Sequence, residues 1–72
     1  MDTIGFIGGG NMAQALIRGI IKAKVYKPKN IFVSDIQPER LAYLSKEYGI
    51  QTVGDNKALA GKVDTLVLSV KP

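Results

Sequence analysis

The hydrophobic and polar positions of this chain change their spacing at a cluster of three glycines. Before the cluster, Thr3–Gly8 (TIGFIG) is an apolar run of β-branched and aromatic side chains, which favours a short strand. The cluster itself, Gly8–Gly10, interrupts the strand. From Asn11 onward the apolar positions recur with the period of a helix. The start of the chain is therefore predicted to be a strand, a glycine turn and a helix.

The predicted first helix carries a wide apolar face. The apolar positions that recur at spacings of three and four residues are Met12, Ala15, Leu16, Gly19, Ile20 and Ala23. The polar positions on the opposite side are Asn11, Gln14, Arg18 and Lys22. Because Ala13, Ile17 and Ile21 extend the apolar face, we expect this helix to be covered on more than one side.

The rest of the chain alternates between predicted strands and helices. Further strands are predicted at Ile31–Ser34, Gln51–Val53 and Thr65–Val70. The segments between them are a loop at Val25–Asn30, a helix that begins at Pro38 and stops before Gly49, and a short helix that Asp55 or Asn56 caps and that reaches Ala60. This alternation, with apolar runs typical of strands buried on both sides, predicts an α/β fold with a Rossmann-type parallel sheet in the order 3-2-1-4.

Composition narrows the possible chemistry. The 72 residues are 46% hydrophobic and 22% charged, as in soluble globular proteins, so disorder is not expected. The chain has no cysteine and no histidine, which excludes disulfides, thiolate metal sites, cysteine nucleophiles and histidine bases. We expect no metal site in it. Without a membrane-spanning apolar segment or a secretory signal, a cytoplasmic location is expected.

The length of the chain predicts that it is part of something larger. A core of this size gives little net stability, and no disulfide or metal adds to it. The last predicted strand, Thr65–Val70, has no following helix to cover it, which leaves an apolar edge exposed. We therefore expect the sheet to be truncated after its fourth strand.

The main signal for chemistry is the pattern Gly8-x-Gly10-x-x-Ala13 between the first strand and the first helix. In the dinucleotide-binding fingerprint, the first glycine permits a tight turn, the second lets a pyrophosphate approach the backbone, and the small third residue lets the helix pack closely on the strand. The amides at the start of the helix would receive the phosphates. A glycine turn that serves packing alone is the alternative. The pattern lacks the Gly-Lys-Ser/Thr ending of an NTPase loop.

A second element of the fingerprint is an acidic residue about 20 positions further along, which binds the adenosine ribose. Asp35, at the end of the second strand, has this place. Alternatively, Asp35 caps the turn into the next helix. Its charge would repel a 2′-phosphate and favour NADH, whereas Ser34 and Arg40 could support that phosphate in NADPH. The expected cofactor is therefore NADPH or NADH.

The net charge of +4 comes largely from a basic run without acidic residues, formed by Arg18, Lys22, Lys24, Lys27 and Lys29. Such a surface could attract nucleic acid. These residues lie at the far end of the first helix, however, and no aromatic side chains alternate with them to stack bases. We expect a solvated face that compensates the helix dipole, with neither nucleic acid nor a membrane as a partner.

The whole chain resembles the N-terminal part of the pyrroline-5-carboxylate reductases. The matching segments are IGFIGGGNMAQALIRG at Ile4–Gly19, VSDIQPERL at Val33–Leu41, DN at Asp55–Asn56 and LSVKP at Leu68–Pro72. The resemblance implies reduction of the C=N bond of 1-pyrroline-5-carboxylate by NAD(P)H, which gives proline in proline biosynthesis. Alternatives are a related NAD(P)- or F420-linked oxidoreductase, such as a 3-hydroxyacid dehydrogenase, and a nucleotide-binding regulatory relative without catalysis.

The resemblance also implies which residues contact the cofactor. Those that would line the pyrophosphate are Phe6, Ile7, Gly8, Gly9, Gly10, Asn11 and Met12. Those expected on the adenosine side are Ser34, Asp35 and Asn56. Those expected toward the nicotinamide ribose are Ser69, Val70, Lys71 and Pro72. Asp35 stands where other members often carry residues that accept a 2′-phosphate more readily, so the resemblance does not decide between the two cofactors.

Family members are several times longer than this chain and continue into a helical domain that forms the dimer and supplies the substrate pocket. Residues 1–72 are thus expected to be the N-terminal part of an NAD(P)-binding Rossmann domain. A homo-oligomer is expected through the absent domain. Because the substrate pocket belongs to the absent domain, no catalytic residue is assigned to this chain. The fragment alone is predicted to be inactive.

Overall fold

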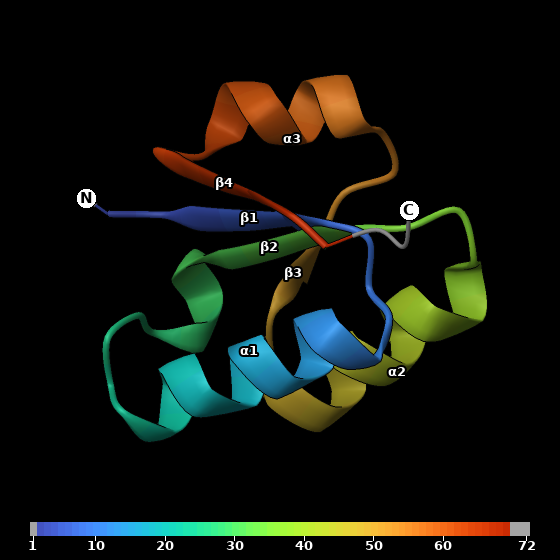
Figure 1. Ribbon diagram of the computed structural model, residues 1–72. Coiled ribbons are helices and arrows are strands. Elements are labelled where there is room, and N and C mark those ends of the chain that lie inside the picture. The colour runs from blue at the N-terminus through green and yellow to red at the C-terminus, as the bar shows by residue number, and fades with distance from the viewer. Residues whose placement is uncertain (1, 70–72) are drawn as a thin grey trace.

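The computed structural model describes residues 2–69, and its elements follow the predicted order (Figure 1). In chain order they are β1 (Ile4–Ile7), α1 (Asn11–Lys22), the 3-10 turn η1 (Pro28–Asn30), β2 (Ile31–Ser34), α2 (Pro38–Tyr48), β3 (Gln51–Thr52), α3 (Asn56–Lys62) and β4 (Thr65–Leu68). The predicted alternation of strands and helices is confirmed. Some bounds differ from the predicted ones, because η1 forms inside the predicted loop and α3 continues past Ala60 to Lys62. Strands β1, β3 and β4 are also shorter than predicted.

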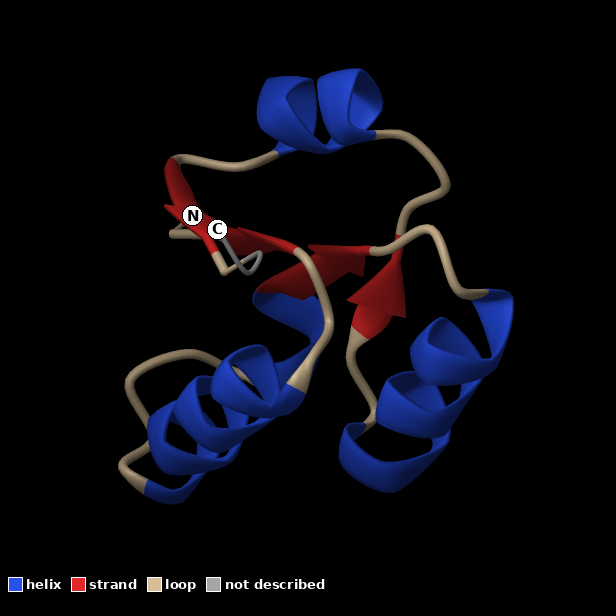
Figure 2. Cartoon of the chain, turned by 45° about the vertical axis from the view of Figure 1, so that its right-hand side comes forward, coloured by secondary structure: helices blue, strands red, loops and turns tan. Residues whose placement is uncertain are grey.

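The four strands form one parallel sheet in the order β3-β2-β1-β4, as predicted. In the centre, Ile4 of β1 is paired with Ile31 of β2 on one side and with Thr65 of β4 on the other. Helices α1 and α2 lie on one face of the sheet and α3 lies on the other (Figures 1 and 2). The sheet is thus the middle layer of three, with its central strand buried.

The ends of the helices follow from local sequence. Gly49 ends α2 in the left-handed conformation, with φ of 72°, and its N–H donates to the Ser45 carbonyl oxygen at 2.8 Å. Of the two candidate caps for α3, the structure uses Asp55, whose side chain accepts a hydrogen bond from the Lys57 N–H at 2.8 Å. These caps place β3 and the start of α3 beside the carboxyl end of β2.

The face that α1 buries is not the predicted one. Ala13 and Ile17 are fully buried against the sheet, whereas Met12 is 55% exposed and Leu16 is 43% exposed. The sheet contacts only one stripe of the helix, and the adjacent Gln14 turns toward α2 instead of solvent, where it donates to two tyrosine hydroxyls. A helix with apolar residues around most of its circumference does not indicate by sequence which stripe its sheet will cover.

Strand β4 keeps the exposed apolar surface that the sequence predicts. Leu66 is 42% exposed and Leu68 is 70% exposed, because α3 packs mainly over β1 and β2. Val67 points to the other face of the sheet and packs against the core. The predicted end of this strand, Val70, lies outside the described residues.

Candidate functional site

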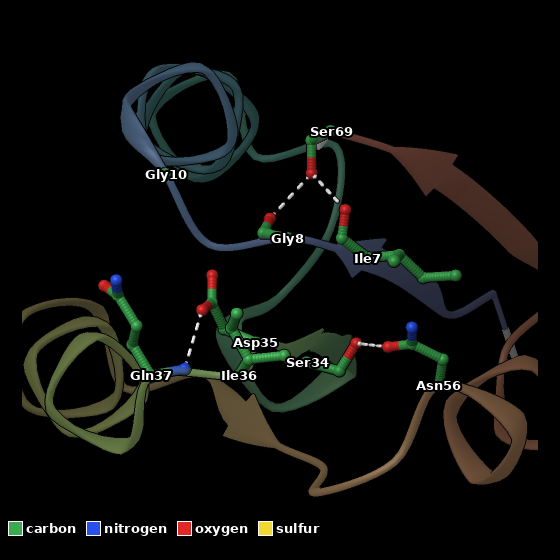
Figure 3. A pocket seen from close by; sticks show the side chains of 9 residues that line it. All are labelled: Ile7, Gly8, Gly10, Ser34, Asp35, Ile36, Gln37, Asn56 and Ser69. Carbon is green, nitrogen blue, oxygen red and sulfur yellow. Dashed lines mark hydrogen bonds between the residues drawn. The ribbon is translucent and has the colours of Figure 1, made fainter. Parts of the chain in front are cut away.

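A cavity of about 450 Å³ opens at the carboxyl ends of β1 and β2 (Figure 3). Its walls are formed by Ile7, Gly8, Gly10, Ser34, Asp35, Ile36, Gln37, Asn56 and Ser69. After β3, the chain crosses back to the other side of β1 to form β4, so the strand order reverses at this cavity. Open parallel α/β sheets bind ligands at such a reversal, beyond the carboxyl ends of the strands.

The residues predicted to contact a cofactor fall into three groups. Those that line the cavity are Ile7, Gly8, Gly10, Ser34, Asp35, Asn56 and Ser69. Those that do not line it are Phe6, Gly9, Asn11 and Met12. Val70, Lys71 and Pro72 lie outside the described residues. Phe6 is completely buried, because the alternation of β1 turns it into the core between the sheet and α1.

Each glycine of the turn answers a different physical need. Gly8 has φ of 101°, a conformation that side-chain-bearing residues rarely adopt. Gly9 has no room for a side chain, because a Cβ there would lie 3.0 Å from Leu44 Cδ1 and 3.3 Å from Asp35 Oδ2. Gly10 has an ordinary φ of −75°, and a Cβ there would meet nothing within 4 Å. At Gly10, unlike Gly9, the absence of a side chain therefore leaves open space.

The backbone of the turn is held by the elements around it. The Gly8 N–H donates to the Ser34 carbonyl oxygen at 2.8 Å, and the buried Ser69 hydroxyl donates to the Gly8 carbonyl oxygen at 2.7 Å (Figure 3). The Gly9 N–H donates to Asp35 Oδ2 at 2.6 Å. The turn is thus fixed from β2 on one side and from the residue after β4 on the other.

The start of α1 lies beside this space without a side-chain cap. Gly10 is the N-cap and has no side chain with which to bond the first amides, and the first turn of the helix contains no acidic residue. The first N–H groups of a helix have no partner inside it, and the helix dipole adds partial positive charge there. Open space in front of these donors suits an anionic group such as a phosphate.

Asp35 occupies the wall of the cavity with its carboxylate already bonded to backbone. Oδ1 accepts a hydrogen bond from the Gln37 N–H at 2.9 Å (Figure 3), and Oδ2 accepts the one from Gly9. The bond from Gln37 holds the turn into α2. This is the capping role that the sequence analysis gave as the alternative to ribose binding. Because a carboxylate oxygen accepts more than one hydrogen bond, ribose hydroxyls can still reach Asp35. The two roles are compatible in this geometry.

Ser34 and Asn56 meet across the cavity, although they are far apart in the sequence. The Ser34 hydroxyl, at the end of β2, donates to Asn56 Oδ1 at the start of α3 (Figure 3). Ser34 is buried, with 2% exposure, whereas Asn56 is exposed. This contact joins the two sides of the cavity that the sequence assigns to adenosine, and it leaves the Asn56 amide nitrogen available to a ligand.

Two lining residues, Ile36 and Gln37, are absent from the sequence predictions. Ile36 is 96% exposed although it is apolar, and it stands directly after Asp35 on the wall of the cavity. An isolated apolar residue that follows a strand-ending acid and belongs to no periodic stripe is a signal that could have identified it. Gln37 is placed there by the turn that Asp35 holds.

Arg40, which the sequence offers as a possible support for a 2′-phosphate, is bonded to the glycine turn and to α1. It is half-buried, its Nε donates to the Gly9 carbonyl oxygen and its Nη2 donates to Gln14 Oε1. Its guanidinium carbon lies 5.2 Å from the centre of the Tyr43 ring. Arg40 does not line the cavity. It lies behind the glycine turn.

Two kinds of feature are absent from residues 2–69. In this range, no three His, Cys, Asp or Glu side chains lie close enough together to hold a metal ion. No helix in the same range is both long and apolar enough to cross a membrane.

Comparison with known proteins confirms the resemblance predicted from the sequence. The chain is 44% identical to pyrroline-5-carboxylate reductase of Methanosarcina acetivorans over 71 residues, which cover 99% of this chain and 26% of that protein. It is 42% identical to the enzyme of the same name of Corynebacterium melassecola over 72 residues, again 26% of the relative. The chain thus spans about a quarter of the length of these relatives.

A solved structure of a pyrroline-5-carboxylate reductase from Coxiella burnetii has the same fold. It superposes with a TM-score of 0.89 at 39% identity and covers 99% of this chain and 26% of that one. Residues 3–72 match the family model described as NADP oxidoreductase, coenzyme F420-dependent. The description of the family model names coenzyme F420, as one of the alternatives in the sequence analysis does. The similar proteins are instead named pyrroline-5-carboxylate reductases. The chain belongs to this family of NADP oxidoreductases.

Proposed function

We propose that this chain is the dinucleotide-binding part of a pyrroline-5-carboxylate reductase, which reduces 1-pyrroline-5-carboxylate to proline with NADH or NADPH. The observation that carries the proposal is the open space at Gly10, in front of the uncapped start of α1. A pyrophosphate fits this space, because nothing lies within 4 Å of a Cβ placed there. The similarity to proteins of this name over 99% of the chain supports the choice of reaction.

The cavity offers a different environment to each part of the cofactor. The pyrophosphate would accept hydrogen bonds from the backbone at Gly10 and from the first turn of α1. On the adenosine side, Asp35 would accept from the ribose hydroxyls and Ile36 would cover one face of the adenine. The nicotinamide end would extend toward Ile7 and Ser69, where β1 and β4 end. We assign Ser34 and Asn56 to the adenosine side as well.

The role of this chain in the reaction is to bind the cofactor and to orient it. A bound nicotinamide cofactor supplies the hydride that the imine carbon accepts. Correct placement of the reacting groups contributes up to about 7–11 kcal/mol in favourable cases. We assign no catalytic residue to residues 1–72. The substrate pocket and the contacts of a homo-oligomer belong, in this proposal, to a further helical domain, and the location is the cytoplasm.

An F420-linked oxidoreductase is the second candidate, because the matching family model carries that description. The two candidates differ in the partner of the nicotinamide cofactor, which is an imine in the first and a deazaflavin in the second. A test of both substrates separates them.

The experiment uses the full-length protein that contains this chain. Titration with NADH and NADPH is followed by assays of their oxidation with 1-pyrroline-5-carboxylate and, separately, with oxidised coenzyme F420 as the hydride acceptor. We expect saturable cofactor binding and formation of proline, and no turnover by residues 1–72 alone. Failure to bind either cofactor would contradict the assignment of the cavity. Cofactor binding with F420 turnover and no proline would favour the second candidate.

A further inference from the structure

Gly9 is the one residue of the glycine turn whose two backbone polar groups are both held by side chains. Its N–H donates to Asp35 Oδ2 at 2.6 Å, and its carbonyl oxygen accepts a hydrogen bond from Arg40 Nε. Asp35 and Arg40 approach it from the end of β2 and the start of α2. Gly9 is itself buried and packed against Leu44 of α2, so it cannot turn away from this pair of contacts.

The guanidinium of Arg40 is fixed by more than its bond to Gly9. Its Nη2 donates to Gln14 Oε1 on α1, and its Cζ lies over the Tyr43 ring, 5.2 Å from the ring centre. Gln14 in turn donates to the hydroxyls of Tyr43 and Tyr48, at 3.2 and 3.1 Å. Arg40 is therefore tied at once to the turn, to α1 and to α2, and its charge lies behind the turn and outside the cavity lining.

We infer that Asp35 and Arg40 form a clamp on the Gly9 peptide groups, called here the Gly9 clamp, and that Arg40 is a positioning residue for the cofactor pyrophosphate. The inference rests on the proposed function. Through Gly9, Arg40 sets the place of the next residue, Gly10, where the pyrophosphate has its space. Arg40 is thus not a ligand of a 2′-phosphate, although it follows Asp35 by only a few positions.

The Gly9 clamp has a consequence that a phosphate ligand would not have. NADH and NADPH share the pyrophosphate and differ only in the 2′-phosphate. A residue that positions the pyrophosphate site must affect both cofactors by the same factor. A residue that binds the 2′-phosphate must affect NADPH alone. The ratio of the two dissociation constants therefore distinguishes the roles.

The test measures the dissociation constants of NADH and NADPH, by nicotinamide fluorescence, for the full-length protein and three variants. Arg40→Met removes the donors and keeps most of the stem. Arg40→Lys keeps the charge and can restore only part of the geometry. Arg18→Met is the matched control, because Arg18 is an exposed cation of α1 and its removal changes the net charge by the same amount.

We expect Arg40→Met to weaken both cofactors by about tenfold, the scale of one charge-assisted hydrogen bond, with their ratio changed by less than about twofold. Arg40→Lys should lose less, again equally for both, and the same criterion applies to it alone if Arg40→Met does not fold. Arg18→Met should leave both values unchanged. Amide exchange at Gly9, followed by NMR with glycine-selective labelling, should be faster in Arg40→Met without cofactor.

Three results would overturn the inference while the proposed function stands. They are a loss confined to NADPH, no loss for either cofactor, and an equal loss in Arg18→Met. A wild-type protein that binds neither cofactor would instead overturn the proposed function and the inference together.

Discussion

Two cavities within residues 2–69 differ both in their charge and in the chemistry assigned to them. Among the described residues that line the cavity at the carboxyl ends of the strands, one is charged, the acidic Asp35. A second cavity, of about 260 Å³, lies at the other end of α1 and contains three lysines, Lys24, Lys27 and Lys29. By charge alone, an anionic dinucleotide would select the second. The proposed function assigns it to the first.

Construction explains the difference. The first cavity is lined by segments from four places in the chain. Its glycine turn is hydrogen-bonded on both sides, which fixes the backbone N–H groups beside the empty volume. The second is formed by one continuous segment, residues 24–30 without Pro28, together with Asp2. Lysine side chains on such a segment are flexible and strongly hydrated. An anion site for a specific ligand thus depends on aimed donors and open space more than on net charge.

The largest expected effect breaks the first cavity without touching the fold. Gly10→Val places a branched side chain in the volume assigned to the pyrophosphate, where a Cβ meets no protein atom within 4 Å. We expect cofactor affinity to fall by about 100-fold or more, with the melting temperature nearly unchanged. Fluorescence titration and thermal unfolding of the full-length protein measure the two quantities.

The control for this variant is Gly19→Val on the far part of the same helix. A Cβ at Gly19 also meets nothing within 4 Å, and Gly19 does not line the cavity. Unchanged affinity in Gly10→Val, or an equal loss in Gly19→Val, would remove the glycine turn from the binding site.

The second effect concerns stability rather than binding. Gly8→Ala forces a side chain into a residue with φ of 101°, which costs about 1–3 kcal/mol. We expect the free energy of unfolding to fall by this amount in chemical denaturation. Gly8 and Gly10 would then differ in kind, since one substitution lowers stability and the other lowers affinity. A Gly8→Ala variant as stable as wild type would show that the turn relaxes easily.

The third effect tests the role of Asp35, the charged residue among the described residues that line the first cavity. Asp35→Asn removes the negative charge beside the expected 2′-phosphate and keeps one oxygen for the Gly9 or the Gln37 N–H. Both cofactors should bind more weakly, because one of these donors loses its acceptor. NADPH should nevertheless gain on NADH by about tenfold, as the repulsion of a nearby charge is relieved. An unchanged ratio of dissociation constants would mean that Asp35 serves only as a cap and a clamp.

The sequence predicts the parts of this site that are carried by local pattern. The glycine turn, the order of strands and helices, and the acid after β2 follow from spacing and period, and the structure has them where predicted. The contacts of Arg40 and Gln14 could not be predicted, because they depend on how α1 and α2 are turned on the sheet. The orientation of α1 on the sheet is also not given by its sequence pattern, which explains why the predicted buried face of this helix was wrong. Local rules decide which elements form, and packing decides which residues of a helix meet.

The fourth effect tests the backbone of the second cavity. Lys24 has φ of 59°, and it follows α1 in a Schellman arrangement in which its N–H donates to the Ile21 carbonyl oxygen at 3.0 Å and the Val25 N–H donates to that of Ile20 at 3.1 Å. Glycine suits this left-handed position better than lysine does. We expect Lys24→Gly to raise the free energy of unfolding by up to about 1 kcal/mol and to leave cofactor affinity unchanged. A loss of stability would contradict the cap assignment.

The smallest expected effect is also the most direct test of the comparison. The double variant Lys27→Met and Lys29→Met removes two of the three cations from the second cavity and lowers the net charge from +4 to +2. If the backbone N–H groups of the glycine turn bind the cofactor, its dissociation constant should change by less than about twofold. This small change would come from the long-range attraction of the lysines, which salt screens. Titrations at low and at 0.15 M salt separate this screened part. A tenfold loss that persists in salt would place the phosphates at the lysines and reverse the assignment of the two cavities.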